Sequence, residues 1–316
     1  MRIVLPEGEE DRILLAADEA AVEGMAEPIL LGREETIGAA CERLGIDMDH
    51  LTVIDPSRSP RSSTYCERYQ QIRGSPPRVA ERIMSRSNYF GAMMVTMGDA
   101  DGMVGGVRYS TGDIIMAADL LIGPREGVST PSSFFLMEVP GTTFGEDGML
   151  AFADPAILPE PTPDELADVA VETARSVRAL LGWEPRVAML SFSTKGSAQH
   201  PSVDRVITAL RKAREKDPKL RIDGELQADT ALVREVAKQK MEEVGEVAGR
   251  ANVLIFPDLN SGNISYKLVQ RLAGANAYGP ILQGYARPVS DLSRGATVKD
   301  IVGAIALVVV LAQEGA

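Results

Sequence analysis

Three segments of the 316-residue sequence place glycine next to small hydroxyl or amide side chains directly after an apolar run. They are residues 101–112, 191–198 and 258–264. Backbone N–H groups in such turns bind phosphate and other anions, particularly beside a cation such as Arg108 or Lys195. One such loop alone is better explained as an ordinary turn, in which glycine supplies positive φ and Ser, Thr or Asn caps the next helix. Three in one chain favour a shared anion-binding cleft.

A fourth segment, residues 291–300, carries a hydroxyl, a guanidinium and a carboxylate just before the apolar C-terminal helix. Ser293 and Arg294 are suited to holding a phosphate beside free backbone N–H groups. Thr297-x-x-Asp300 also fits a capping box, in which the acidic residue only closes the start of the helix. From the spacing alone, capping is the favoured interpretation of Asp300.

The elements that position these loops follow from the hydrophobic pattern. Short apolar runs alternate with helical periodicity, which predicts βα units and a mostly parallel sheet covered on both faces, with ligands at the carboxyl ends of its strands. The predicted strands are 2–5, 28–32, 91–95, 134–139, 186–190 and 252–257. The predicted helices are 11–23, 163–181, 202–216, 229–244 and 264–275. A stretch rich in Gly, Pro, Asp and Thr between residues 140 and 163 predicts a domain crossing.

Composition limits the classes of function. The net charge of −12 gives no general attraction for nucleic acid or anionic lipid, so an anionic ligand must be bound locally. The longest apolar stretch, 301–312, is too short to span a membrane, and without a leader sequence we expect a cytoplasmic protein. Two histidines without metal-ligand spacing argue against metal catalysis. Cys41 and Cys66 are interpreted as buried or incidental thiols.

Over nearly its full length the chain resembles the phosphate acetyltransferase and phosphate butyryltransferase family, particularly its phosphotransacetylase branch. The resemblance rests on LPEG at 5–8, ADGMVGG at 100–106, LSFSTKGSA at 190–198, IDGELQ at 222–227, IFPDLNSGNISYK at 255–267, YGPILQG at 278–284 and PVSDLSRG at 288–295. It implies two three-layer α/β/α domains around a cleft, as in the isocitrate and isopropylmalate dehydrogenase-like fold. Domain 1 is expected to comprise 1–138 and 284–316, and domain 2 to comprise 139–283.

The activity that the resemblance implies is reversible acetyl transfer, in which acetyl-CoA and phosphate give CoA and acetyl phosphate. It implies direct attack of the CoA thiolate in a ternary complex, no metal, no tightly bound cofactor and a homodimer. The catalytic residues are expected to be Ser293, Arg294 and Asp300. As the proton acceptor, Asp300 would then do more than cap the helix. Arg73 resembles an arginine that the family uses near the nucleotide phosphate of CoA.

The remaining binding residues expected from the resemblance are Ser110, Thr111, Lys195, Asn260 and Asn263. For Lys195, support of the loop backbone is an equally good interpretation. The asparagines either line the cleft or build its turn, and the sequence does not decide between these roles.

Met116 is the main departure from the family, which ordinarily has an active-site arginine at this place. A thioether brings neither charge nor donor to a phosphate, so the loss is worth about 2 to 4 kcal/mol of transition-state stabilisation. Arg108 is the nearest replacement, although an arginine beside a glycine-rich turn is as often a solvated surface residue. Met116 therefore keeps open a weakly catalytic or non-catalytic module that binds acyl-CoA or acyl phosphate.

Two further alternatives stay open at this stage. One is a phosphate acyltransferase for a longer chain such as propionyl or butyryl, because pocket shape sets the preference and no motif reveals that shape. The other is an NAD-dependent decarboxylating dehydrogenase of the same fold, which is less well supported because the sequence has neither the acidic metal-binding set nor a dinucleotide fingerprint.

Overall fold

A computed structural model describes residues 1–313 and divides the chain into two compact units. The N-terminal unit comprises Met1–Glu126 and the C-terminal segment from Tyr285, and the central unit comprises Gly127–Gly284. The sequence predicted the crossings after residues 138 and 283. Residues 127–138 group with the central unit because β5 (Ser132–Glu138) pairs antiparallel with β10 (Asn276–Gln283).

The N-terminal unit is built on five parallel strands in the order β3-β2-β1-β4-β11. They are β1 (Arg2–Leu5), β2 (Glu27–Leu31), β3 (Thr52–Ile54), β4 (Gly102–Gly105) and β11 (Val289–Asp291). Because the C-terminal segment supplies β11, residues almost two hundred positions apart in the chain pair directly, as Asp291 does with Gly105. The loops that follow β1, β4 and β11 all leave the sheet at its carboxyl edge.

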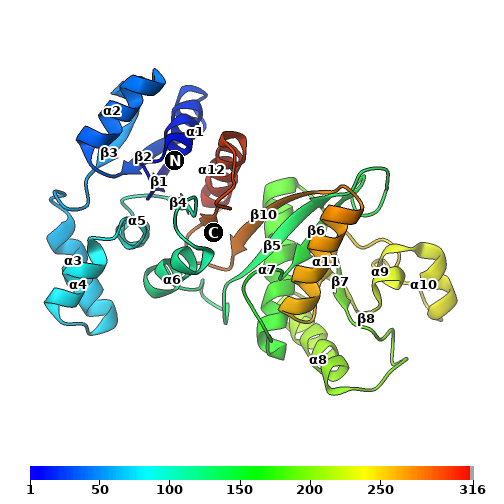
Figure 1. Cartoon of the computed structure of the whole chain (residues 1–316). Coiled ribbons are helices and arrows are strands. Elements are labelled where there is room, and N and C mark those ends of the chain that lie inside the picture. The colour runs from blue at the N-terminus through cyan, green and yellow to red at the C-terminus, as the bar shows by residue number, and fades with distance from the viewer. Residues whose placement is uncertain (314–316) are drawn as a thin grey trace. The chain divides into compact units, whose positions relative to one another are not determined.

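Helices cover this sheet. They are α1 (Asp11–Val22), α2 (Glu34–Leu44), η1 (Met48–His50), α3 (Ser62–Arg73), α4 (Pro77–Met84), α5 (Ser87–Thr96), α6 (Thr111–Leu121) and α12 (Val298–Gln313). Figure 1 shows α1 and α12 lying side by side, and their apolar side chains share one core with those of β1. The strand predicted at 91–95 is wrong, because these residues are the buried middle of α5. A short, wholly apolar run does not distinguish a strand from a buried helix.

The central unit has six strands in the order β10-β5-β6-β9-β7-β8. The four not yet given are β6 (Met149–Ala153), β7 (Arg186–Leu190), β8 (Arg221–Leu226) and β9 (Val253–Ile255), and these four run parallel to one another. Its helices are α7 (Pro163–Leu181), α8 (Pro201–Lys216), α9 (Ala228–Leu232), α10 (Arg234–Lys240) and α11 (Leu259–Leu272). The α/β class predicted from the sequence is confirmed.

Local signals explain where the helices of the central unit begin and end. Thr162 and Glu165 form a capping box and Pro163 takes the first helical position, so α7 matches its predicted range. The helix predicted at 229–244 is wrong as a single element, because Val233 is extended and separates α9 from α10. Asp258 accepts a hydrogen bond from the Ser261 N–H, so α11 begins earlier than predicted. None of the helices within residues 1–313 is long and apolar enough to cross a membrane.

Candidate active site

The buried carboxylate of Glu7 organises the loop that follows β4. It accepts hydrogen bonds from four successive backbone N–H groups, those of Gly106 (2.8 Å), Val107 (3.0 Å), Arg108 (2.5 Å) and Tyr109 (2.8 Å). A carboxylate held by several N–H donors is a strong local restraint, since each of these hydrogen bonds is charge-assisted. Glu7 thus takes the place of an anion in this glycine-rich loop and fixes its path. This role of Glu7 was not predicted, because the only signal for it in the sequence is the LPEG string.

Gly106 allows the β4 loop to approach the end of β11. Its φ is +123°, and a Cβ on it would lie 2.4 Å from Asp291 Oδ1 and 2.6 Å from the Leu292 carbonyl oxygen. Asp291 is buried, and Thr111 donates a hydrogen bond of 2.6 Å to its Oδ2. Within residues 1–313, Asp291 Oδ1 has no hydrogen-bond partner. Burial, with a smaller contribution from nearby Glu7, raises the pKa of Asp291 to about 6.

The predicted catalytic pair Ser293 and Arg294 lies in the exposed loop directly after β11. Ser293 Oγ accepts a hydrogen bond of 3.2 Å from the Gly295 N–H, an interaction that turns the loop. In the described part of the chain the Arg294 guanidinium has neither a hydrogen-bond partner nor an ion-pair partner. Its charge is therefore available to an anion.

Arg12 of α1 holds the backbone of this loop. Its Nη1 donates to the carbonyl oxygens of Arg294 (3.0 Å) and Ala296 (2.8 Å). The same guanidinium pairs with Glu10 Oε1 at 3.0 Å, while Glu10 Oε2 accepts a hydrogen bond of 2.8 Å from Arg108. Burial raises the pKa of Glu10, but the hydrogen bonds from Arg108 and Arg12 outweigh burial and hold the pKa below its usual value. Glu10 and Arg12 thus connect the β4 loop to the Ser293–Arg294 loop, which the sequence analysis did not foresee.

Asp300 forms the capping box that its spacing predicted. Its Oδ2 accepts from the Thr297 N–H and Thr297 Oγ1, both at 2.8 Å, and the Asp300 N–H donates back to Thr297 Oγ1 at 3.3 Å. The side chain is exposed, and Asp300 Oδ1 has no hydrogen-bond partner within residues 1–313. One oxygen caps α12 while the other faces solvent, so capping leaves an acceptor for a proton.

Ser110 and Thr111 begin α6, and both hydroxyls have protein partners. Ser110 is the N-cap of α6, and its Oγ donates to Asp113 Oδ2 at 2.6 Å within a capping box. Thr111 donates to Asp291. An anion at this helix start would therefore meet backbone N–H groups rather than the two hydroxyls. Met116 lies one and a half turns further along α6 with 56% of its surface exposed.

A cavity of about 330 Å³ opens at the carboxyl ends of β1 and β2 in the N-terminal unit. Its lining residues are Pro6, Glu7, Glu9, Leu31, Gly32, Ser87, Arg108 and Tyr109. Arg108, the predicted replacement for the missing arginine, therefore lines a cavity at the expected edge of the sheet. Its guanidinium is paired with Glu10 and its side chain is 60% exposed.

Arg73 is the last residue of α3, and the following Gly74 has a φ of +62° that ends the helix. Its side chain is exposed, and the guanidinium has no ion-pair or hydrogen-bond partner in the part of the chain that the structure describes. The structure thus leaves Arg73 available for a phosphate but links it to none of the loops above.

Lys195, in the central unit, is held by its own loop. It follows β7 with a φ of +47°, and its Nζ donates to Asp223 Oδ1 at 2.5 Å and to the Gly224 carbonyl at 2.6 Å. Buried Glu225 fixes the same loop by accepting from Ser193 Oγ and from the Gly196 N–H. This geometry favours a supporting role for Lys195 over a free phosphate contact.

The two predicted asparagines both lie in the first turns of α11. Asn263 Nδ2 donates to the Pro155 carbonyl at 2.9 Å, so this side chain builds the loop after β6. Asn260 is exposed, and its amide has no side-chain partner among residues 1–313. Because β7 pairs parallel with β9, Asn260 and Lys195 lie at the same edge of the central sheet. The predicted residues thus form two groups, one in each unit.

The structure offers neither a thiol nucleophile nor a metal cluster among the described residues. Burial raises the pKa of the Cys41 and Cys66 thiols, which disfavours the reactive thiolate. No group of three or more His, Cys, Asp or Glu side chains within residues 1–313 is arranged to hold a metal ion.

The chain is similar to known proteins over its whole length. Residues 1–309 match the family model described as phosphate acetyl/butaryl transferase. The phosphate acetyltransferase of Thermoanaerobacterium thermosaccharolyticum is 50% identical over 315 residues, which is 99% of this chain and 95% of that protein. The phosphate acetyltransferase of Clostridium acetobutylicum is 46% identical over 317 residues, again with 99% and 95% coverage.

The chain is also similar to solved structures. A phosphotransacetylase from Streptococcus pyogenes is 42% identical, with a TM-score of 0.95 over 99% of this chain and 94% of that chain. A 4-hydroxythreonine-4-phosphate dehydrogenase from Burkholderia phymatum, 12% identical with a TM-score of 0.55 over 98% of each chain, shares the fold alone. The family match and the identity to both relatives agree, and the chain belongs to the phosphate acetyl/butyryl transferase family.

Proposed function

We propose that this protein is a phosphate acetyltransferase, which transfers an acetyl group reversibly between acetyl phosphate and CoA. The observation that carries the proposal is the exposed Ser293–Arg294 loop, whose arginine has no protein partner in the described chain while Arg12 holds its backbone. The relatives named phosphate acetyltransferase at 50% and 46% identity support the same activity. The likeness to a dehydrogenase is of fold alone and supports no dehydrogenase function.

In this proposal Arg294 stabilises charge rather than exchanging protons. A thiol has a pKa of about 8.5, and a nearby guanidinium favours its thiolate. Arg294 also offers several N–H donors to a phosphoryl oxygen, and Ser293 offers a hydroxyl to the acyl phosphate. Both groups act on the charge that passes from the thiolate to the departing phosphate, so they lower the barrier in either direction.

Asp300 is proposed to accept the proton of the CoA thiol through Oδ1, the oxygen that capping leaves without a partner. With reference pKa values of about 3.9 and about 8.5, transfer to an ordinary carboxylate costs about 6 kcal/mol. Asp300 can therefore accept the proton only if Arg294 lowers this cost by stabilising the thiolate as it forms. The second oxygen, held by Thr297, orients the carboxylate.

Arg108 is proposed to supply the charge that Met116 lacks. Arg108 lines the 330 Å³ cavity, and its backbone N–H is fixed by Glu7. The long side chain is exposed, and within residues 1–313 its guanidinium is held by one ion pair, with Glu10, so rotation toward a phosphate costs little. Met116 is exposed on α6 and is not among the residues that line the cavity.

The catalytic assignments are tested by thioester formation from acetyl phosphate and CoA. Arg294→Ala and Asp300→Asn are expected to lower kcat at least a hundredfold, because each removes a group that interacts with the transition state. Arg43→Gln is the matched control, since Arg43 is an exposed arginine of the same unit paired with Asp11. A wild-type rate for either variant would remove that residue from the mechanism.

Met116→Arg separates an active enzyme from a non-catalytic binding module. We expect the wild-type protein to be active and Met116→Arg to improve it less than tenfold, while Arg108→Gln slows it. No thioester from acetyl, propionyl or butyryl phosphate, with recovery in Met116→Arg, would contradict the proposal and favour the binding module. A faster rate with propionyl or butyryl phosphate would reassign the acyl chain.

The partners expected from the resemblance also belong to this proposal. Arg73→Ala is expected to raise KM for CoA more than it lowers kcat, and an unchanged KM would exclude Arg73 from the CoA site. An exposed apolar row on α11, formed by Ile264, Leu268 and Leu272, supports the proposed homodimer. Analytical ultracentrifugation of wild type and Leu268→Glu tests it, since a wild-type monomer would refute the dimer. The cytoplasmic location stays a prediction, which cell fractionation can test.

A further inference from the structure

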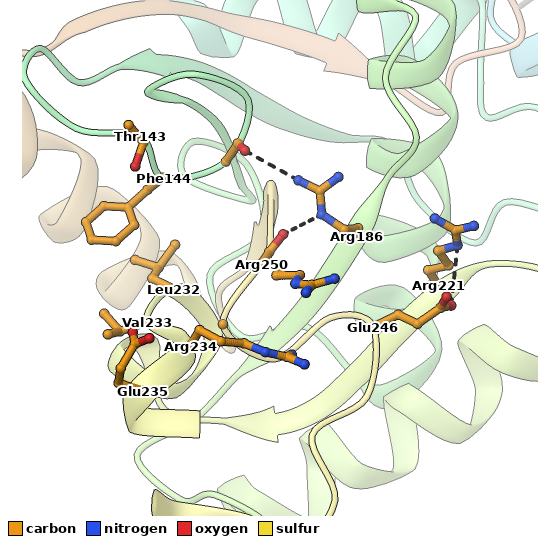
Figure 2. A pocket seen from close by; sticks show the side chains of 12 residues that line it. Thr143, Phe144, Arg186, Arg221, Leu232, Val233, Arg234, Glu235, Glu246 and Arg250 are labelled. Atoms are coloured by element: carbon orange, nitrogen blue, oxygen red, sulfur yellow. Dashed lines mark hydrogen bonds and ion pairs between the residues drawn. The ribbon is translucent and has the colours of Figure 1, made fainter. Parts of the chain in front are cut away.

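A second cavity, of about 490 Å³, lies wholly within the central unit (Figure 2). Arg186 and Arg221 are the first residues of β7 and β8, and Arg250 precedes β9, so the cavity lies at the amino ends of the parallel strands. The loops that carry Lys195 and Asn260 leave the same strands at their carboxyl ends. The cavity is therefore at the opposite edge of the sheet from the candidate substrate loops, and its volume is in the range of small-molecule sites.

Two of the four arginines that line the cavity are neutralised by acidic side chains. Arg186 pairs with Glu146 at 2.9 Å, and Arg221 pairs with Glu246 at 3.4 Å. Figure 2 shows Arg186 also bridging two loops through backbone carbonyls, among them that of Arg250. Arg186 and Arg221 thus help to build the walls.

Arg234 and Arg250 have no carboxylate partner among the described residues. Arg234 donates only to the backbone carbonyls of Gly245 (3.1 Å) and Ala248 (2.9 Å). The Arg250 guanidinium has no hydrogen-bond or ion-pair partner within residues 1–313. The lining has four arginines and two carboxylates, those of Glu235 and Glu246. In a protein with a net charge of −12, this local excess of guanidiniums indicates a site for an anion.

The other side of the cavity is mostly apolar, apart from the carboxylate of Glu235. Phe144, whose side chain is 39% exposed, lies with Leu232 and Val233 on the side away from the arginines in Figure 2. An exposed aromatic ring next to aliphatic side chains suits stacking of a flat ring. Arginine forks on one wall suit phosphoryl oxygens, for which guanidinium is the preferred bidentate partner.

We infer that this cavity binds a small molecule with adjacent phosphoryl groups attached to an aromatic base, that is, a nucleoside diphosphate or a close relative. The phosphoryl groups lie against Arg234 and Arg250, and the base stacks on Phe144. Within the central unit, the site lies at the opposite edge of the sheet from the loops that carry Lys195 and Asn260. The inference rests on the lining of this cavity and does not depend on the proposed function.

The test is calorimetric titration of the wild-type protein with ADP, with pyrophosphate and with inorganic phosphate as probes. Arg250→Gln is the main variant, because its guanidinium has no partner within residues 1–313 and the substitution keeps the backbone carbonyl that Arg186 binds. It is expected to raise the Kd for ADP and for pyrophosphate at least tenfold. Arg211→Gln, which removes an exposed charge on α8 of the same unit, is the control and is expected to leave both Kd values unchanged.

Phe144→Ala separates the two halves of the site. It is expected to weaken the binding of ADP severalfold and to leave the Kd for pyrophosphate unchanged, because only ADP carries a base that can stack on the ring. Since ADP is also part of CoA, the titration is repeated in Arg73→Ala, where binding at the cavity is expected to persist. No saturable ADP binding at millimolar concentration, an ADP affinity unaffected by Arg250→Gln, or ADP binding lost in Arg73→Ala would each overturn the inference.

Discussion

Replacing Arg12 by glutamine is expected to slow acyl transfer although its guanidinium is already engaged by protein groups. Its guanidinium donates hydrogen bonds to the carbonyls of Arg294 and Ala296, and it anchors the loop to Glu10. Hydrogen bonds from a charged donor contribute about 1.5 to 3 kcal/mol each when buried, and the Arg12 side chain is one third exposed. After that discount, the loss of both contacts releases about 2 kcal/mol of restraint on the loop, which predicts about a 30-fold fall in kcat.

The assay is thioester formation with saturating CoA and acetyl phosphate, with kcat and both KM values measured for Arg12→Gln, Arg12→Lys and wild type. Arg12→Lys keeps a charged donor and is expected to recover part of the rate. Arg43→Gln, which breaks an exposed ion pair to α1, is the control and is expected to have the wild-type rate. Circular dichroism and the melting temperature verify that each variant is folded.

A double-mutant cycle distinguishes positioning from direct catalysis. If Arg12 acts only by holding the loop, Arg12→Gln has little left to remove once Arg294 is alanine, so the double variant is about as slow as Arg294→Ala. Fully additive losses would refute the positioning role. A wild-type kcat for Arg12→Gln would refute the reasoning altogether, because the restraint would then contribute nothing to the reaction.

Three further predictions concern the loops around Glu7. Glu7→Gln is expected to lower the free energy of unfolding by about 3 kcal/mol, and with it the melting temperature, because the amide turns an N–H donor toward the backbone N–H groups. An unchanged melting temperature would contradict this. With a folded pKa of about 6 and an unfolded value near 3.9, Asp291 contributes stability below pH 4 that is lost as pH rises through 6, about 3 kcal/mol in total. Melting curves of Asp291→Asn from pH 4 to 8 should lack this dependence, and curves parallel to wild type would refute it. Gly106→Ala is expected to disrupt the fold, because the new Cβ meets Asp291 at 2.4 Å; a soluble variant with the wild-type melting temperature would contradict the close approach.

Much of the fold could be predicted because its signals are local. Apolar periodicity and a capping box define α7, and short apolar runs define β1 and β7. Where a signal is ambiguous, prediction fails: residues 91–95 satisfy both a buried strand and a buried helix, and only packing against β1 and β4 decides. Strand β4 was read only as part of a glycine-rich loop, because two of its four residues are glycine.

The candidate site also contains residues that the sequence identifies and residues that it does not. The Ser293–Arg294 string and the capping box at Asp300 are contiguous, so the sequence alone identifies them. Glu7 and Arg12 are not identified in this way, because the groups that they hold lie about 100 and 282 residues away in the sequence. Their roles arise only when parallel pairing brings the loops after β1, β4 and β11 to one edge. A buried glutamate that binds backbone N–H groups leaves no periodic pattern in the sequence from which it could be predicted.

The distribution of charge explains how an acidic protein can serve anionic substrates. Acidic side chains outnumber basic ones, 45 against 33, so most arginines are close to a carboxylate and are neutralised by it. Arg12 and Arg108 share Glu10 in this way: Arg12 acts as a structural cation, while Arg108 has to leave Glu10 before it can reach an anion. Arg294 and Arg250 differ because the described chain offers no carboxylate to either, although they lie in different units. Since the long-range field repels an anion, binding must come from such short-range, uncompensated guanidiniums, and their positions indicate where anions are bound.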